Sequence, residues 1–219
     1  MDIVIENIFN KIILIFELLG VIAFAVSGAM NAIKKHIDLF GVIFIATTTA
    51  LGGGVIRDVM LQKLPPSMFT NHIYISFAFA TSLIVFFTAY IQNKKNISFH
   101  IDKIDFIINI FDAVGLGIFS ILGVKIALSS GYSYSLIYCA FIGMLTGVGG
   151  GMLRDIMLME VPYVLRKRVY AVASILGSVV YYLLYSFRVN DFIAISCGCI
   201  IIVAIRILAG HYNWNLPKI

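Results

Sequence analysis

The chain has 219 residues, of which 61% are hydrophobic and only 12% charged, and its mean hydropathy is +1.00. Soluble domains carry about 25% charged residues, so this composition excludes an ordinary soluble protein and indicates a single transmembrane domain over residues 1–219. The net charge of +5 does not indicate nucleic-acid binding, because most lysines and arginines lie in short clusters between apolar runs, as membrane-orientation signals do.

Seven apolar runs follow one another along the chain. Each is long enough to cross a hydrocarbon core of about 30 Å, which takes about 20 residues. The first run is too long for a signal peptide, so we expect it to be a helix of the mature protein. Prolines end the second and fifth runs, and the long polar loop 92–103 follows the third. The predicted helices cover about residues 10–33, 39–61, 71–91, 105–128, 136–159, 169–187 and 192–209.

The second and fifth runs contain nearly the same ten residues. GGGVIRDVML at 52–61 returns as GGGMLRDIML at 149–158, with seven identical positions. Pro65 and Pro162 follow the two motifs at the same spacing of 97 residues. A match of this length indicates an internal duplication.

The duplication extends over three helices. In the helices before the two motifs, Glu17 aligns with Asp112 and Gly28 with Gly123. The repeats therefore cover about 10–91 and 105–187, and the helix at 192–209 has no partner. Three crossings per repeat turn the second copy upside down, which predicts an inverted pair about a pseudo-two-fold axis in the membrane plane.

The distribution of basic residues predicts the orientation. Nine lie on the side reached after the odd-numbered helices, against Lys11, Lys63 and Arg188 on the other side. The positive-inside rule then places the N-terminus outside and the C-terminus in the cytoplasm. The nine are Lys34, Lys35, Lys94, Lys95, Lys103, Arg166, Lys167, Arg168 and Lys218.

Three consecutive glycines weaken a helix by about 1 kcal/mol each relative to alanine, so we expect the second and fifth helices to be broken there. In hydrocarbon an opened backbone survives only if it is buried in protein or lines a wet cavity, which favours a pore or site. The alternative is that the glycines only allow close helix packing. The candidate lining residues are Gly52, Gly53, Gly54, Gly149, Gly150 and Gly151, with the hydroxyls of Thr48, Thr49 and Thr146.

Charged residues inside the predicted helices need partners or water. Glu17 and Arg57 share one depth, and by the inverted repeat Asp112 and Arg154 share another. We therefore predict the ion pairs Glu17–Arg57 and Asp112–Arg154. Adjacent helical residues point about 100° apart, so we expect Asp58 and Asp155 to stay free of their neighbouring arginines and to attract cations. The alternative is that the arginines reach the lipid headgroups.

Other residues give weaker or negative indications. Lys125, near the outer end of the fourth helix, is interpreted first as a snorkelling side chain and second as a gating charge. Three cysteines in apolar runs form neither a disulfide framework nor a metal-ligand spacing, and no catalytic motif occurs. We expect no catalytic residue, metal or cofactor. The cysteines are Cys139, Cys197 and Cys199.

The twin GGG-x-x-RD-x-M-L motif on seven helices resembles the prokaryotic members of the trimeric intracellular cation (TRIC) channel family, also described as bacterial glycine-transporter-like membrane proteins. The resemblance covers about residues 10–210. It implies a homotrimer among the lipids of a bacterial inner membrane. Each protomer would have its own pore for potassium or other monovalent cations, lined by glycine-broken helices two and five. A helix-four lysine linked to gating in animal members is similar in place to Lys125.

The residues themselves leave two functions open, a passive cation channel and a carrier for a small solute such as glycine. The potassium-filter sequence TVGYG is absent from the chain. A channel of this sequence is therefore expected to be only modestly selective among cations.

Overall fold

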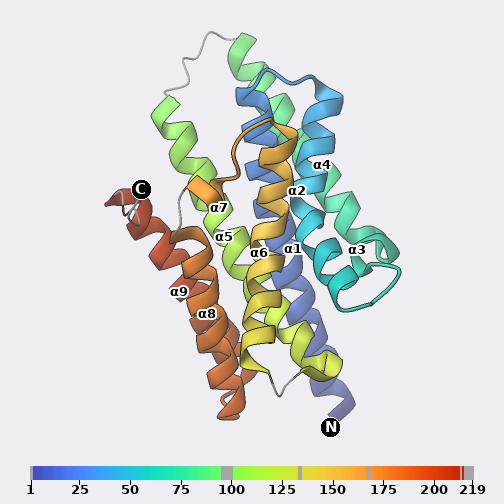
Figure 1. The fold of residues 1–219 in the computed structure, drawn as a ribbon. Helices are drawn as coiled ribbons and strands as arrows, with labels where there is room; N and C mark the ends of the chain where they lie inside the picture. Colours follow the sequence, from blue (N-terminus) through green and yellow to red (C-terminus); the bar gives the residue numbers. More distant parts are fainter. Residues whose placement is uncertain (1, 95–100, 133–134, 167–168, 213, 215–219) are drawn as a thin grey trace.

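The structure is a computed structural model that describes residues 2–94, 101–132, 135–166, 169–212 and 214. Lys95, Lys167, Arg168 and Lys218, which count toward the predicted orientation, lie outside the described residues. All secondary-structure elements of the described residues are helices (Figure 1). Its elements are α1 (Asp2–Lys34), α2 (Leu39–Met60), α3 (Ser67–Thr70), α4 (His72–Lys94), α5 (Ile101–Ala127), the π-helical turn η1 (Leu128–Tyr132), α6 (Leu136–Met157), α7 (Tyr163–Arg166), α8 (Val169–Ser186) and α9 (Asp191–His211).

Within these ranges seven helices, α1, α2, α4, α5, α6, α8 and α9, are long and apolar enough to cross a membrane. The prediction of an all-helical protein with seven transmembrane helices is therefore confirmed, and the chain is a multi-pass membrane protein. The short helices α3 and α7 were not predicted, because four residues after a proline are too few to show a helical period.

The second helix of each repeat begins with the same kind of cap. Asp38 accepts a hydrogen bond from the backbone N–H of Gly41 at the start of α2, at 2.8 Å. Ser135 accepts one from the N–H of Tyr138 at the start of α6, at 3.2 Å. A side-chain acceptor at this position satisfies one of the free N–H groups of the first turn.

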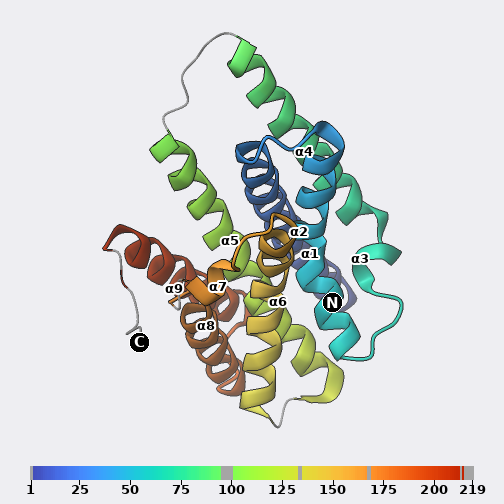
Figure 2. The same cartoon turned by 45° about the horizontal axis from the view of Figure 1, so that its top comes forward.

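The centre of the bundle is formed by α1, α2, α5 and α6, with α4 on one flank and α8 and α9 on the other (Figure 2). α1 and α5 meet in a reciprocal contact. Gly20 faces the ring of Phe119, Gly115 faces the ring of Phe24, and the two rings stack with their centroids 5.4 Å apart. Such exchanged contacts between antiparallel helices are those expected of inverted repeats.

α2 and α6 meet in a second reciprocal contact, at the glycine triplets. A Cβ atom added at Gly53 would lie 2.0 Å from the carbonyl oxygen of Thr146, and one added at Gly150 would lie 2.1 Å from that of Thr49. Any side chain larger than hydrogen would therefore separate the two backbones.

The expected break at the glycines is not found. Both helices continue through the triplets, α2 to Met60 and α6 to Met157. The physical reason is the backbone contact, since glycine allows two membrane helices to approach each other without opening either of them. The alternative interpretation, close packing, describes this structure.

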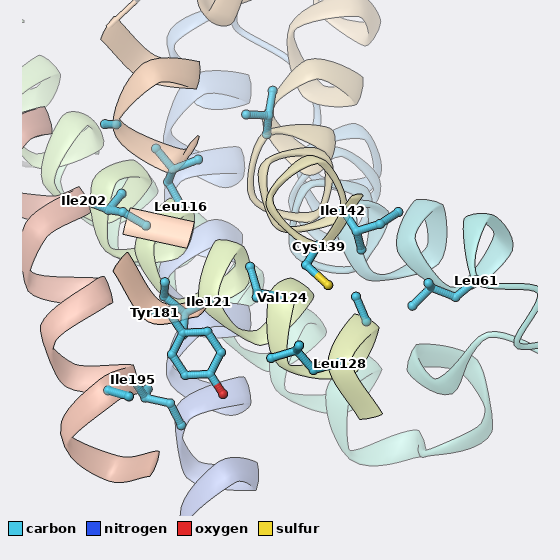
Figure 3. Packing of buried hydrophobic residues seen from close by; sticks show 14 of the residues in the cluster. Leu61, Leu116, Ile121, Val124, Leu128, Cys139, Ile142, Tyr181, Ile195 and Ile202 are labelled. Atoms are coloured by element: carbon cyan, nitrogen blue, oxygen red, sulfur yellow. The ribbon is translucent and has the colours of Figure 1, made fainter. Parts of the chain in front are cut away.

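The unpaired helix α9 packs against α5 and α8 and enlarges the apolar core of the second repeat. Ile121 of α5, Tyr181 of α8, and Ile195 and Ile202 of α9 lie together in this core (Figure 3). Gly177 of α8 and Gly198 of α9 each face the other's carbonyl oxygen, which brings these two helices close together. Cys139 is buried in the same core, as a small core residue.

The backbone contact between α2 and α6 at the glycine triplets predicts that alanine has different effects at Gly53 and at its neighbour Gly52. Gly53→Ala places its methyl group against a backbone carbonyl that cannot move alone, so we expect a loss of about 1–3 kcal/mol or more. Gly52→Ala is the matched control, because its methyl group would press only on the flexible end of the Leu153 side chain and would lie at an ordinary contact distance of 3.7 Å from the Gly150 backbone. Thermal unfolding of the detergent-solubilised protein measures both variants. Equal losses would contradict the proposed role of the Gly53 contact.

Candidate functional site

Two clusters of polar residues, each built around a buried arginine, lie at the C-terminal ends of α2 and α6. The first, called here the Arg57 cluster, consists of Glu17, Arg57, Asp58, Ser67 and Tyr74. Arg57 Nε donates to Asp58 Oδ1 at 2.7 Å, and both side chains are almost fully buried. Asp58 Oδ2 accepts from the backbone N–H of Ser67 at 2.8 Å and from its hydroxyl at 2.7 Å. Asp58 therefore holds the first residue of α3 against the end of α2.

Glu17 completes the Arg57 cluster, but it does not pair with Arg57 as predicted. Its carboxylate accepts a hydrogen bond from the hydroxyl of Tyr74 on α4. The guanidinium of Arg57 is directed instead to Asp58 and to the Ser67 hydroxyl, the latter at 3.2 Å. An equal depth in the membrane was therefore not sufficient to pair Glu17 with Arg57, because Tyr74 binds Glu17 and Asp58 binds Arg57.

The second cluster, called here the Arg154 cluster, is formed around Arg154. Its other members are Ser27, Asp112, Asp155, Tyr163, Tyr170 of α8 and Arg206 of α9. Arg154 Nη1 lies 2.8 Å from Asp112 Oδ1 and donates at the same distance to the Ser27 hydroxyl. Arg154 Nη2 lies 2.8 Å from Asp155 Oδ1. Asp155 Oδ2 accepts from the backbone N–H of Tyr163 at 2.6 Å. The structure thus brings Asp112 and Arg154 together and adds Ser27 from the other repeat.

The expectation that the two aspartates stay free is wrong. Asp58 and Asp155 each bind the adjacent arginine and the first backbone N–H of the following short helix. The angle of about 100° between neighbouring positions describes only the start of a side chain, and the long arginine side chain curls around the helix to reach its neighbour. In a buried site, a carboxylate without such partners would be costly.

The structure also corrects the register of the duplication after the motif. Asp58 binds the N–H of Ser67, which follows Pro66, and Asp155 binds the N–H of Tyr163, which follows Pro162. The equivalent prolines are therefore Pro66 and Pro162, which are 96 rather than 97 residues apart. Tyr74 of α4 and Tyr170 of α8 follow the same spacing of 96 residues. The first repeat has one additional residue in the loop between the Arg-Asp motif and the short helix.

The threonines next to the glycines do not present free hydroxyls. Thr49 donates to the carbonyl of Ile45, and Thr146 donates to that of Ile142, both at 2.6 Å. Their side chains pack against Gly28 and Gly123, respectively. Thr48 is half-buried. In this conformation Thr49 and Thr146 support helix packing.

Lys125 forms an ion pair with Asp191, the first residue of α9, and both side chains are 19% exposed. Asp191 also accepts a hydrogen bond from the Tyr181 hydroxyl at 2.8 Å. Lys125 is therefore tied to α8 and α9 through one carboxylate, and it does not extend alone toward the headgroups. Asp191 was missed because a charge at a helix start is ordinary in sequence.

Arg206 of α9 is the functional candidate that sequence analysis missed entirely. Its guanidinium lies 4.4 Å from the centre of the Tyr170 ring and 5.1 Å from that of Tyr163. Its Nη2 donates to Asn109 Oδ1 at 2.9 Å and lies 3.6 Å from Asp112 Oδ2. α9 has no counterpart in the first repeat, so the repeat could not identify it. The signal was an arginine within an apolar run.

Two further features lie apart from the clusters. An apolar cavity of about 670 Å³ opens between α1, α4 and the first turns of α5. Among the described residues, no group of three histidine, cysteine or acidic side chains is placed to hold a metal ion.

Comparison with known proteins supports the repeat and the fold. A family model described as glycine transporter matches the chain twice, at residues 14–90 and 109–186. The UPF0126 inner membrane protein YadS of Escherichia coli is 31% identical over 202 residues, which cover 92% of this chain and 93% of that protein. The UPF0126 membrane protein YvgT of Bacillus subtilis is 32% identical over 204 residues, or 93% and 95% of the two chains.

Solved structures share the whole fold. A prokaryotic TRIC channel crystallised in 0.5 M KCl matches with a TM-score of 0.84 and 32% identity, over 94% of this chain and all of that one. The TRIC orthologue from Rhodobacter sphaeroides matches with a TM-score of 0.83 and 26% identity, over 93% of this chain and all of that one. The seven-helix architecture is thus that of TRIC-type membrane proteins. The chain belongs to the family of bacterial membrane proteins described as glycine transporter, whose fold it shares with the prokaryotic TRIC channels.

The two clusters predict unequal coupling energies. Asp112 and Arg154 are in direct contact, so a double-mutant cycle with Asp112→Asn and Arg154→Gln should give a coupling above about 1 kcal/mol. Glu17→Gln with Arg57→Gln should give less than about 0.5 kcal/mol, because no ion pair joins these two residues. Unfolding free energies in detergent provide both cycles. Strong coupling of Glu17 to Arg57 would contradict the described geometry.

Proposed function

We propose that this protein is a channel for potassium and other monovalent cations, with an ion pathway within each protomer along α2 and α6. The observation that carries the proposal is the position of the Arg57 and Arg154 clusters at opposite ends of this antiparallel pair. A charge near the bilayer centre costs about 2.5–3.5 kcal/mol and commonly marks an ion pathway. The matched solved structures are TRIC cation channels, which supports channel function rather than catalysis.

The spacing of the clusters suits such a pathway. The middle of the glycine crossing lies at position 51 of α2, midway between Thr49 and Gly53, and at position 148 of α6, midway between Thr146 and Gly150. Arg57 and Arg154 each lie six residues beyond these positions, which is about 9 Å at 1.5 Å per residue. The two clusters therefore fall within the hydrocarbon core of about 30 Å, on either side of its middle. A cation would meet one charged cluster, the crossing, and then the other charged cluster.

The crossing itself is the proposed constriction. The backbones of α2 and α6 touch at Gly53 and Gly150, and this leaves no room for an ion between them. We propose that conduction requires the two helices to separate there, which would turn the carbonyl groups of Thr49 and Thr146 toward the pathway. Backbone carbonyls can replace part of the water shell of a potassium ion.

The assembly and surroundings are also proposals. The matched orthologue from Rhodobacter sphaeroides is a TRIC trimeric intracellular cation channel, and we propose that this chain is likewise a homotrimer in a bacterial inner membrane. The outer face of α4 carries exposed apolar side chains suited to lipid or to a neighbouring protomer, including Phe77, Phe79, Ile84 and Phe87.

The proposed orientation predicts the location of two reporter sites. With the N-terminus outside, a reporter fused after Lys94 should be cytoplasmic, whereas one fused after Lys63 should be external. Fusions of the chain to alkaline phosphatase and to a fluorescent protein measure both positions. An external reporter after Lys94 would reverse the proposed topology.

The proposed function predicts unitary currents from the purified protein in planar bilayers. In asymmetric KCl the current should reverse toward the potassium equilibrium potential rather than the chloride one, and sodium should pass as well. Because the family model is described as a glycine transporter, glycine uptake and counterflow in liposomes form the parallel measurement. Saturable glycine counterflow without currents would favour the carrier instead.

A further inference from the structure

The two clusters differ in charge although their repeats match. The Arg57 cluster has two carboxylates, Glu17 and Asp58, and a single guanidinium, so its acidic groups outnumber its basic groups by one. The Arg154 cluster has two carboxylates, Asp112 and Asp155, and two guanidinium groups, since Arg206 joins Arg154. The charge that balances the second cluster comes from α9, which lies outside both repeats.

Arg206 is positioned by neutral groups more than by the acid. The Tyr163 and Tyr170 rings lie beside its guanidinium, and Asn109 accepts its direct hydrogen bond at 2.9 Å. The separation from Asp112 Oδ2 is longer, at 3.6 Å. Only 2% of Arg206 is exposed, and its Nε has no hydrogen-bond partner. The charge is thus held beside Asp112 without a tight ion pair.

Arg154 and Arg206 face different oxygens of Asp112. Asp112 Oδ1 receives Arg154 and the Ser27 hydroxyl, while Oδ2 faces Arg206. A mobile cation that approached Asp112 would therefore compete with Arg206 for the same oxygen. Since a buried positive charge repels a second one strongly at low dielectric, Arg206 would keep such a cation away.

We propose that Arg206 is a selectivity-determining residue that closes the Arg154 cluster to mobile cations and so makes it the more restrictive end of the ion pathway. This inference rests on the proposed channel function for its physiological meaning. It assigns a role to the seventh helix, which supplies a charge that neither repeat contains. A purely structural role, in which Arg206 only joins α9 to α5 and α8, makes different predictions.

Cysteine labelling tests the inference without requiring a current. Ser27→Cys, in a background with Cys139, Cys197 and Cys199 replaced by alanine, reports on access to the Arg154 cluster. Cationic and anionic methanethiosulfonate reagents of similar size are compared with and without Arg206→Gln. We expect the rate of the cationic reagent to rise about 5-fold or more in the variant, with little change in the rate of the anionic reagent. Ser67→Cys, at an exposed position of the Arg57 cluster, is the control for the other cluster, and its labelling rates should be unaffected by Arg206→Gln.

Further variants separate charge from packing. Arg206→Lys keeps the charge but loses the planar group beside the tyrosine rings, so it should keep the cationic rate low. Asn109→Leu removes the hydrogen bond that positions Arg206 and should raise the cationic rate, and it provides the test if Arg206→Gln does not fold. Equal increases for both reagents, or no increase at all, would overturn the inference.

Bilayer recordings connect the labelling to the proposed function. If the wild type conducts, Arg206→Gln should raise the potassium conductance and change the asymmetry of the current–voltage relation, whereas Arg206→Lys should not. If the wild type passes no current but the labelling behaves as expected, the channel proposal fails while the role of Arg206 in excluding cations stands.

Discussion

The contact of two backbones at the glycine triplets is the constraint on which the rest of this structure depends. With Gly53 against the Thr146 carbonyl and Gly150 against that of Thr49, the backbones of α2 and α6 are in direct contact. Their approach fixes the neighbouring helices α1 and α5, whose own glycines face the hydroxyls of Thr49 and Thr146. In a membrane, where apolar side chains gain little by leaving lipid, such close packing is a main source of helix association.

The buried charges gain a structural role from the same arrangement. Each Arg-Asp pair lies just beyond the crossing, and its aspartate caps a short helix that turns back toward the bundle. Asp58 and Asp155 thus connect the end of one transmembrane helix to the start of the short helix that follows it. The cost of burying these groups is offset by ion pairs and backbone hydrogen bonds within each cluster.

Sequence analysis identified the parts of the structure that depend on periodicity and repetition. Hydropathy defined the seven helices, and the duplicated motif located Arg57, Asp58, Arg154 and Asp155 in equivalent places. Sequence analysis failed where a side chain has several possible binding partners and only the folded structure decides between them. Glu17 binds Tyr74 because a tyrosine on α4 lies within reach, which no spacing along the chain reveals. The glycines were ambiguous for a related reason, since three in a row suit both an opened helix and a close crossing, and only the neighbouring backbone decides between them.

The reciprocal contact of Phe24 with Phe119 has an evolutionary consequence. Two identical three-helix chains meeting about a two-fold axis would place the same residue opposite itself, as an isologous dimer does. In such a dimer every substitution near the axis would appear on both sides, and the two membrane faces would remain equivalent. Joining the copies in one chain frees each half to diverge, and a single added helix can then serve only one of them. The difference between the two membrane faces of this molecule is one that a symmetric dimer of identical chains could not have.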